Sequence, residues 1–176
     1  MMTRYAAFLR GINLGRTNKV AMPQLRAMAN RLGYENVKTY INSGNLVFTA
    51  EEAASAAALA GQIRDGIQHD FGLTIDVAVR TEGQLRALLA SNPFPQGDPS
   101  RVTVAFLVSD PPSDAEKRLA AAADAPYMFA GTEVWVNYTH GQAGSRLAAQ
   151  FSKVIGVSST IRNLRTVSRT LALLDA

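Results

Sequence analysis

The residues with the clearest capacity for chemistry are a run of cations, asparagines and glycines without an acid. Residues 10–19 read Arg-Gly-Ile-Asn-Leu-Gly-Arg-Thr-Asn-Lys. Between a strand and a helix, backbone N–H groups of such a loop can bind phosphate. The glycine spacing differs from that of the phosphate-binding loop of nucleotide hydrolases, so that motif is excluded. Candidate ligand-binding residues here are Arg10, Asn13, Arg16 and Lys19, and an ordered surface loop is the alternative.

A second polar segment, residues 42–45, reads Asn-Ser-Gly-Asn. Asn and Gly both tolerate positive φ, so a tight turn explains the segment without any function. The functional interpretation is a polar pocket beside Lys19, and it gains weight if the two segments touch. Its candidate residues are Asn42, Ser43 and Asn45.

A third candidate lies near the C-terminus, where residues 162–166 read Arg-Asn-Leu-Arg-Thr. Arginines at a strand end and in the first turn of a helix suit phosphate or carboxylate binding. Because cations in a first turn oppose the helix dipole, a compensating role is expected for them. The candidate residues are Arg162, Asn163 and Arg165.

Catalysis has weaker support. His140 could act as an acid or base and Ser145 as a nucleophile, but Ser145 is also an apt helix N-cap. The chain has no cysteine, and its two histidines lack ligand spacing, so we expect no metal and no cofactor. An enzyme acting on a small anionic substrate remains an alternative, as does a structural or dimerising module.

The elements that must position these residues occur in the same order twice. In the first half we expect strands at 5–10, 37–41, 46–48 and 75–79, with helices at 23–32, 52–71 and 82–89. In the second half we expect strands at 102–108, 127–129, 134–138 and 160–161, with helices at 113–123, 145–155 and 164–174. Ser113 is the predicted N-cap of the helix at 113–123.

This order predicts an α+β fold of two tandem ferredoxin-like halves, β-α-β-β-α-β plus a helix, with antiparallel sheets. We predict a first half at 1–91, a Pro-rich linker at 92–100 and a second half at 101–176. The topology brings the loop at 10–19 and the turn at 42–45 to one end of the first sheet. It brings the loop at 140–145 and residues 162–163 to the opposite end of the second.

Three blocks also resemble a known family. They resemble the signature of the bacterial family called domain of unknown function 1697. The blocks are Phe-Leu-Arg-Gly-Ile-Asn-Leu-Gly from Phe8, Asn-Lys-Val from Asn18 and Thr-Tyr-Ile-Asn-Ser-Gly-Asn-Leu-Val-Phe from Thr39. The tail Thr-Ile-Arg-Asn-Leu-Arg-Thr-Val from Thr160 resembles its C-terminal motif, with Leu164 where the family often has Trp. The resemblance implies two ferredoxin-like halves and no assigned activity.

The net charge of +4 is unevenly distributed. Residues 1–34 contain six cations and residues 141–174 contain five, and neither stretch has an acid. Residues 35–140 carry thirteen acids against seven cations. We predict that the two basic ends meet in space and bind a phosphate-bearing ligand, either nucleic acid or a nucleotide-like small molecule. Without an apolar run of about 20 residues or a leader-like start, we expect a cytoplasmic protein with no membrane partner.

Overall fold

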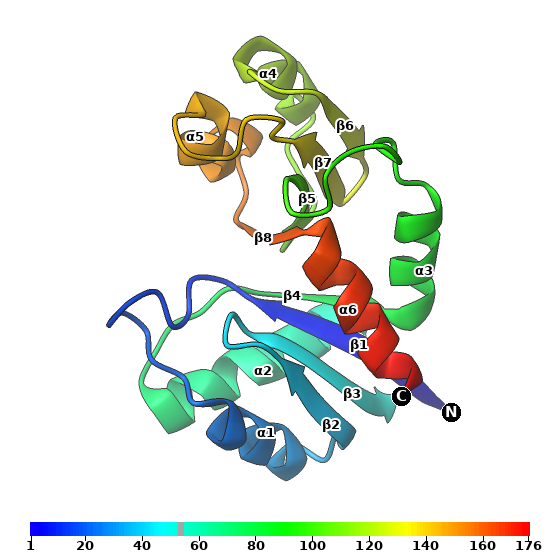
Figure 1. The fold of residues 1–176 in the computed structure, drawn as a ribbon. Coiled ribbons are helices and arrows are strands. Elements are labelled where there is room, and N and C mark those ends of the chain that lie inside the picture. Colours follow the sequence, from blue (N-terminus) through cyan, green and yellow to red (C-terminus); the bar gives the residue numbers. More distant parts are fainter. Residues whose placement is uncertain (53–54) are drawn as a thin grey trace. The chain divides into compact units, whose positions relative to one another are not determined.

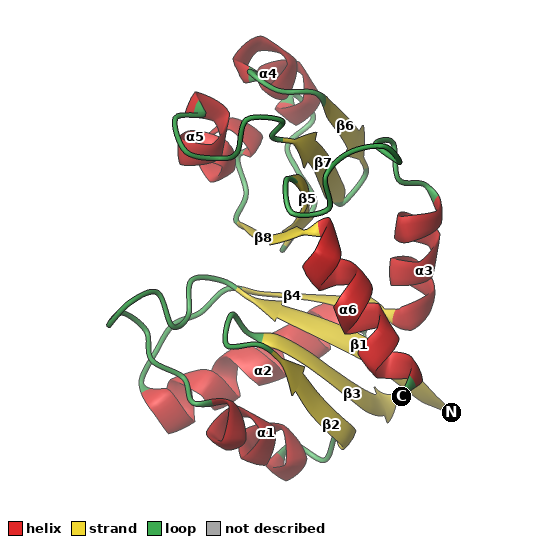
Figure 2. Cartoon of the chain, in the orientation of Figure 1, coloured by secondary structure: helices red, strands yellow, loops and turns green. Residues whose placement is uncertain are grey.

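The protein contains two four-stranded antiparallel sheets, each with its own helices (Figure 1, Figure 2). The computed structural model describes residues 1–52 and 55–176. The chain forms two units, Met1–Ala90 with Ser168–Ala176, and Ser91–Val167. The predicted α+β fold of two tandem ferredoxin-like halves is confirmed.

The first unit has the sheet order β2-β3-β1-β4. Its elements are β1 (Met2–Leu9), α1 (Met22–Arg31), β2 (Glu35–Tyr40), β3 (Asn45–Glu51), α2 (Ala56–Phe71), β4 (Val77–Thr81) and α3 (Glu82–Ala90). The core lies between the sheet and the helices α1 and α2. Leu25 and Met28 recur at helical spacing on α1, Ile63 and Ile67 on α2, and all four side chains are buried.

The second unit repeats this topology, with the sheet order β6-β7-β5-β8. Its elements are β5 (Val102–Leu107), α4 (Ala115–Ala122), β6 (Tyr127–Ala130), β7 (Glu133–Asn137), α5 (Arg146–Ile155) and β8 (Ser159–Asn163), followed by α6 (Leu164–Asp175). Leu119 on α4 and Leu147, Phe151 and Ile155 on α5 pack in its core.

Two helix starts differ from the predictions. α2 begins at Ala56 with Ser55 as its N-cap, later than the predicted start at residue 52; Ala53 and Ala54, also in the predicted helix, lie outside the described residues. α4 begins at Ala115, and Ser113 is not its N-cap. The Ala115 N–H donates to the Pro112 carbonyl, so a turn set by the prolines precedes the helix.

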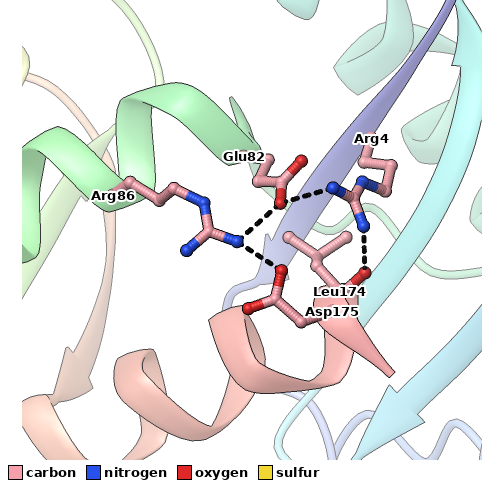
Figure 3. A network of polar contacts seen from close by, with 5 residues as sticks. All are labelled: Arg4, Glu82, Arg86, Leu174 and Asp175. Atoms are coloured by element: carbon pink, nitrogen blue, oxygen red, sulfur yellow. Dashed lines mark hydrogen bonds and ion pairs between the residues drawn. The ribbon is translucent and has the colours of Figure 1, made fainter.

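The division into units falls inside α6, since Ser168–Ala176 belong to the first unit. From the sequence, all of 101–176 was expected in the second half and 92–100 was expected to be a separate linker. Polar contacts hold the end of α6 in the first unit (Figure 3). Arg4 donates to the Leu174 carbonyl at 2.8 Å and pairs with Glu82 at 2.8 Å, while Arg86 pairs with both Glu82 and Asp175.

Candidate functional site

The loop after β1 and the turn between β2 and β3 lie at the same end of the first sheet. The Leu9 N–H donates to the Gly44 carbonyl at 2.9 Å, and the Arg10 N–H donates to the Asp76 carbonyl at 3.0 Å. These bonds extend the pairing of β1 beyond its last residue. They bring residues 10–21 beside residues 41–45, and we call these two segments together the loop pair.

Asn13 joins the two segments through its side-chain amide. Its Nδ2 donates to the Val20 carbonyl at 2.8 Å and to the Asn42 carbonyl at 2.7 Å, while its Oδ1 accepts from the Val20 N–H at 2.8 Å. Asn18 adds a second clamp, donating from Nδ2 to the Gly11 carbonyl at 3.0 Å. Both asparagines have positive φ, which Asn tolerates better than most residues. The two polar segments therefore touch, which favours the functional interpretation of both.

The turn has its own internal support. Asn45 is fully buried, and its Nδ2 donates to the Tyr40 carbonyl and to Ser43 Oγ, each at 3.0 Å. Gly44 has φ +87°, and a Cβ at this position would lie 2.8 Å from both Ile12 Cδ1 and Leu9 Cβ. Asn13 and Asn45 thus use their amides to hold the backbone, whereas Asn42 is exposed and only its carbonyl takes part in these bonds.

The exposed surface of the loop pair is basic with two apolar side chains. Arg10, Arg16 and Lys19 are exposed, and residues 10–21 contain no acid. Within the described chain, Arg16 and Lys19 make no ion pair. Leu14 is 65% exposed and Ile41 is 51% exposed. Ile41 also has φ +48°, a left-handed conformation that is strained for a β-branched residue.

The helix that follows the loop has an N-terminus without a side-chain cap. Ala21 occupies the N-cap position of α1 and makes no side-chain cap, and the first turn has no acid. Pro23 lies in that turn and has no N–H, so the N–H groups of Met22 and Gln24 and the positive end of the helix dipole remain, shortly after Lys19.

The helix α5 of the second unit, which is the counterpart of α2, has an N-terminus that an acid caps. Asp124 accepts from Ser145 Oγ at 2.8 Å and from the Arg146 N–H at 2.8 Å. Hydrogen bonding by Ser145 is the largest cause of the lowered pKa of the Asp124 carboxyl. A carboxylate therefore already occupies the position at which α5 would bind a phosphate.

Ser145 and His140 do not form a nucleophile–base pair. Ser145 Oγ donates to Asp124 and accepts from the Ala148 N–H at 3.1 Å, as an N-cap does. His140 is exposed and lines a pocket of about 230 Å³ together with Asp124, Tyr138 and Ser145. Burial raises the pKa of Tyr138 to about 12, so its hydroxyl stays protonated at neutral pH. Ser145 is thus a helix cap in this geometry.

The C-terminal candidates lie at the junction of β8 and α6. Arg162 is half-buried, donates to the Ile161 carbonyl at 3.0 Å, and burial lowers its pKa to about 10. Asn163 Oδ1 accepts from the Thr166 N–H at 2.9 Å and so caps α6. Arg165 is exposed in the first turn. Because these residues belong to the second unit and the loop pair to the first, the meeting of the two basic ends stays a prediction.

Two further features are absent from residues 1–52 and 55–176. No group of three or more His, Cys, Asp or Glu side chains is arranged to hold a metal ion there. No helix in that part of the chain is long and apolar enough to span a membrane.

A family model described as "Protein of unknown function (DUF1697)" matches residues 2–135, which include the whole loop pair. The chain belongs to the DUF1697 family. Residues 160–167, which resemble the family's C-terminal motif, lie beyond that match.

Among solved structures, this DUF1697 protein is similar to the conserved bacterial protein SP0830 from Streptococcus pneumoniae. The TM-score is 0.76 at 27% sequence identity, and the match covers 99% of each chain. No curated protein matches the chain.

The acid that caps α5 and the strain at Ile41 were not predicted from the sequence. Asp124 lies 21 residues before Ser145, and no local motif connects them. The opposite charge of the two corresponding loops could have been predicted from the sequence, because residues 108–114 of the second unit correspond to residues 10–21 of the first. Residues 108–114 contain Asp110 and Asp114 and no cation, the reverse of their counterpart.

Proposed function

We propose that this DUF1697 protein binds a phosphate-bearing ligand at the loop pair. The observation that carries the proposal is the set of hydrogen bonds from the Asn13 side chain, which joins the two segments. Arg16 and Lys19 are exposed on the loop that these bonds hold, with no acid beside them in sequence. Because side-chain amides hold the backbone in place, little backbone entropy is lost when a ligand binds to these cations.

Each part of the loop pair has a distinct role in this proposal. Arg16 donates in a fork to phosphate oxygens, and Lys19 adds a point charge. The uncapped N-terminus of α1 supplies the backbone N–H groups of Met22 and Gln24, while Pro23 between them has none. Arg10 adds positive charge, Asn42 and Ser43 orient the ligand, and Asn13 and Asn45 maintain the scaffold.

The C-terminal motif belongs to the same proposal as a second source of charge. Arg162 and Arg165 contribute cations, and Asn163 orders the turn that carries them. The cytoplasm is the proposed compartment, supported by the absence of cysteine. We propose binding and not catalysis, because Ser145 caps a helix and its proton is directed at Asp124.

The experiment is a binding titration with three probes: a fluorescent single-stranded oligonucleotide, a mononucleotide and inorganic phosphate. We expect Arg16→Gln with Lys19→Gln to weaken binding at least about tenfold, since each charge-assisted hydrogen bond contributes about 1.5–3 kcal/mol. Arg64→Gln with Arg146→Gln removes the same charge from exposed helix positions and serves as the matched control.

The salt dependence distinguishes the two ligand classes. A nucleic acid gives a steep fall in affinity between about 50 and 200 mM salt, and the loop variant reduces that slope. If the natural ligand is a small molecule, the protein should bind the mononucleotide or inorganic phosphate, and the affinity should fall only slightly as the salt concentration rises. Absence of binding in all three arms at low salt would overturn the proposal, as would equal losses in the loop variant and its control.

A further inference from the structure

The two units place equivalent loops at the same end of equivalent sheets. In the first unit, Leu9 N–H donates to the Gly44 carbonyl and Arg10 N–H to the Asp76 carbonyl. In the second, Leu107 N–H donates to the Thr132 carbonyl and Val108 N–H to the Ser158 carbonyl. Residues 108–114 and the turn at 131–132 are therefore the counterparts of the loop pair.

The segments of the second unit that correspond to the loop pair are acidic, and a groove lies between them. A groove of about 460 Å³ lies between the loop after β5 and the turn between β6 and β7, and we call it the acidic groove. Its apolar lining comes from Pro111, Pro112 and the half-buried Phe129, and its charges come from Asp110 and Glu116. Asp114 is already paired with Arg118 at 3.2 Å, whereas Asp110 and Glu116 make no ion pair within the described chain.

The loop pair offers what such a groove would bind. Leu14 and Ile41 expose aliphatic side chains on segments joined by the Asn13–Asn42 hydrogen bond. Arg16 and Lys19 are exposed on the same loop. The chain thus carries an apolar tip with cations on one unit, and an apolar groove with anions on the other.

We propose that the acidic groove binds the loop pair of a second copy of this chain. Leu14 and Ile41 pack against Phe129 and the two prolines, and Arg16 and Lys19 pair with Asp110 and Glu116. Apolar burial drives the contact, and charge complementarity selects the partner and its orientation. The inference goes beyond the proposed ligand site but uses the same cations, so a phosphate-bearing ligand and a second copy compete.

The size of the complex depends on whether the contact between two copies is reciprocal. If each copy seats its loop pair in the groove of the other, the product is a dimer with two equal contacts. If the contact is made in one direction only, chains grow with concentration. The contact is small, so we expect weak association that high salt dissolves.

Sedimentation velocity over a concentration series tests the proposal. At about 200 µM protein, an association with a Kd near 100 µM places more than half of the chains in complexes. We expect the mean mass to rise with concentration at low salt. Arg16→Glu with Lys19→Glu (the loop variant) and Asp110→Lys with Glu116→Lys (the groove variant) should each stay monomeric.

Charge reversal supplies a rescue that a folding defect would not give. Mixing the loop variant with the groove variant restores both charge pairs, so the mixture should associate although neither variant does alone. The fourfold variant should also self-associate, whereas Arg64→Glu with Arg146→Glu should behave as wild type. A wild type that stays monomeric at about 200 µM in low salt overturns the proposal, as does a mixture that fails to associate.

The outcome is separable from that of the ligand proposal. Asp110→Asn with Glu116→Gln removes the acids of the groove without adding lysines and retains Arg16 and Lys19, so this variant should bind the phosphate-bearing probes about as the wild type does. A monomeric wild type that binds the probes overturns only the self-association. A self-associating wild type that binds no probe overturns only the ligand site, and a probe that dissolves the complexes supports both.

Discussion

At the scale of single residues, the conformation of Ile41 is the most unusual feature of the loop pair. A β-branched residue at φ +48° stores about 1–3 kcal/mol of strain, and this one is also half exposed to water. Ile41→Asn should therefore stabilise the first unit by about 1 kcal/mol in urea unfolding, since Asn tolerates this conformation. The same variant should weaken self-association, because it removes an apolar contact.

Leu14→Asn is the matched control, since Leu14 is also an exposed aliphatic residue but does not have positive φ. Its stability should stay within about 0.5 kcal/mol of wild type. A loss of stability in Ile41→Asn, or an equal gain in Leu14→Asn, would show that the conformation of Ile41 carries no strain.

The residue types that form the loop pair were predictable from the sequence, but the contacts that each side chain makes were not. The sequence analysis expected Asn and Gly to adopt positive φ around residues 42–45, and Gly44 does so. The strand predicted at 37–41 ends at Tyr40, and Ile41 is a second left-handed residue of that turn. Asn45 is buried and holds the turn through the Tyr40 carbonyl. Which asparagine binds backbone and which faces solvent depends on contacts such as Asn13–Val20, which local sequence does not determine.

At the scale of elements, the two hairpin turns provide a matched pair of glycines. Gly44 and Gly131 both have positive φ, but a Cβ on Gly44 would meet Ile12 and Leu9, while one on Gly131 would meet nothing within 4 Å. Gly131→Ala should cost about 1–2 kcal/mol from conformation alone. Gly44→Ala adds overpacking, so we expect a further loss of about 1–3 kcal/mol in urea unfolding.

This comparison also tests how the loop pair is held together. A larger loss in Gly44→Ala should be accompanied by weaker phosphate-probe binding, because the turn must move away from the loop after β1. Equal losses in the two variants would mean that the turn packs loosely there and that the Asn13 bonds alone join the segments.

Element order was readable from the sequence because hydrophobic periodicity and turn residues are local. The helix predicted at 145–155 with Ser145 as N-cap appears as α5, with Ser145 in that role. Helix starts next to alanine-rich or proline-rich segments were less predictable. At α4, the turn formed by Pro112 competes with the cap predicted at Ser113. Competition of this kind depends on the geometry of the preceding strand.

At the scale of the whole molecule, the chain returns to its first unit at the end. Residues Ser168–Ala176 belong with Met1–Ala90, although α6 follows directly on the last strand of the second unit. The periodicity of α6 predicted a helix but not which sheet it serves. Arg86 and Asp175 are about half exposed and only Glu82 is largely buried, so the ion pairs of Arg86 with these two acids are screened by water and contribute little stability.

Burial of apolar side chains must therefore hold this segment, and Leu174 is the residue to test. It is 6% exposed, lines a pocket with Val47 and Phe48 of β3, and its carbonyl accepts from Arg4 (Figure 3). Leu174→Ala should cost the first unit about 2–3 kcal/mol. In hydrogen exchange, amides of β1 and β3 should then lose protection while those of β5 and β7 keep it. Arg169→Ala, on the exposed side of α6, should leave both sheets unchanged. Equal loss of protection in the two sheets would mean that the units unfold together, and α6 would then couple them instead of belonging to one.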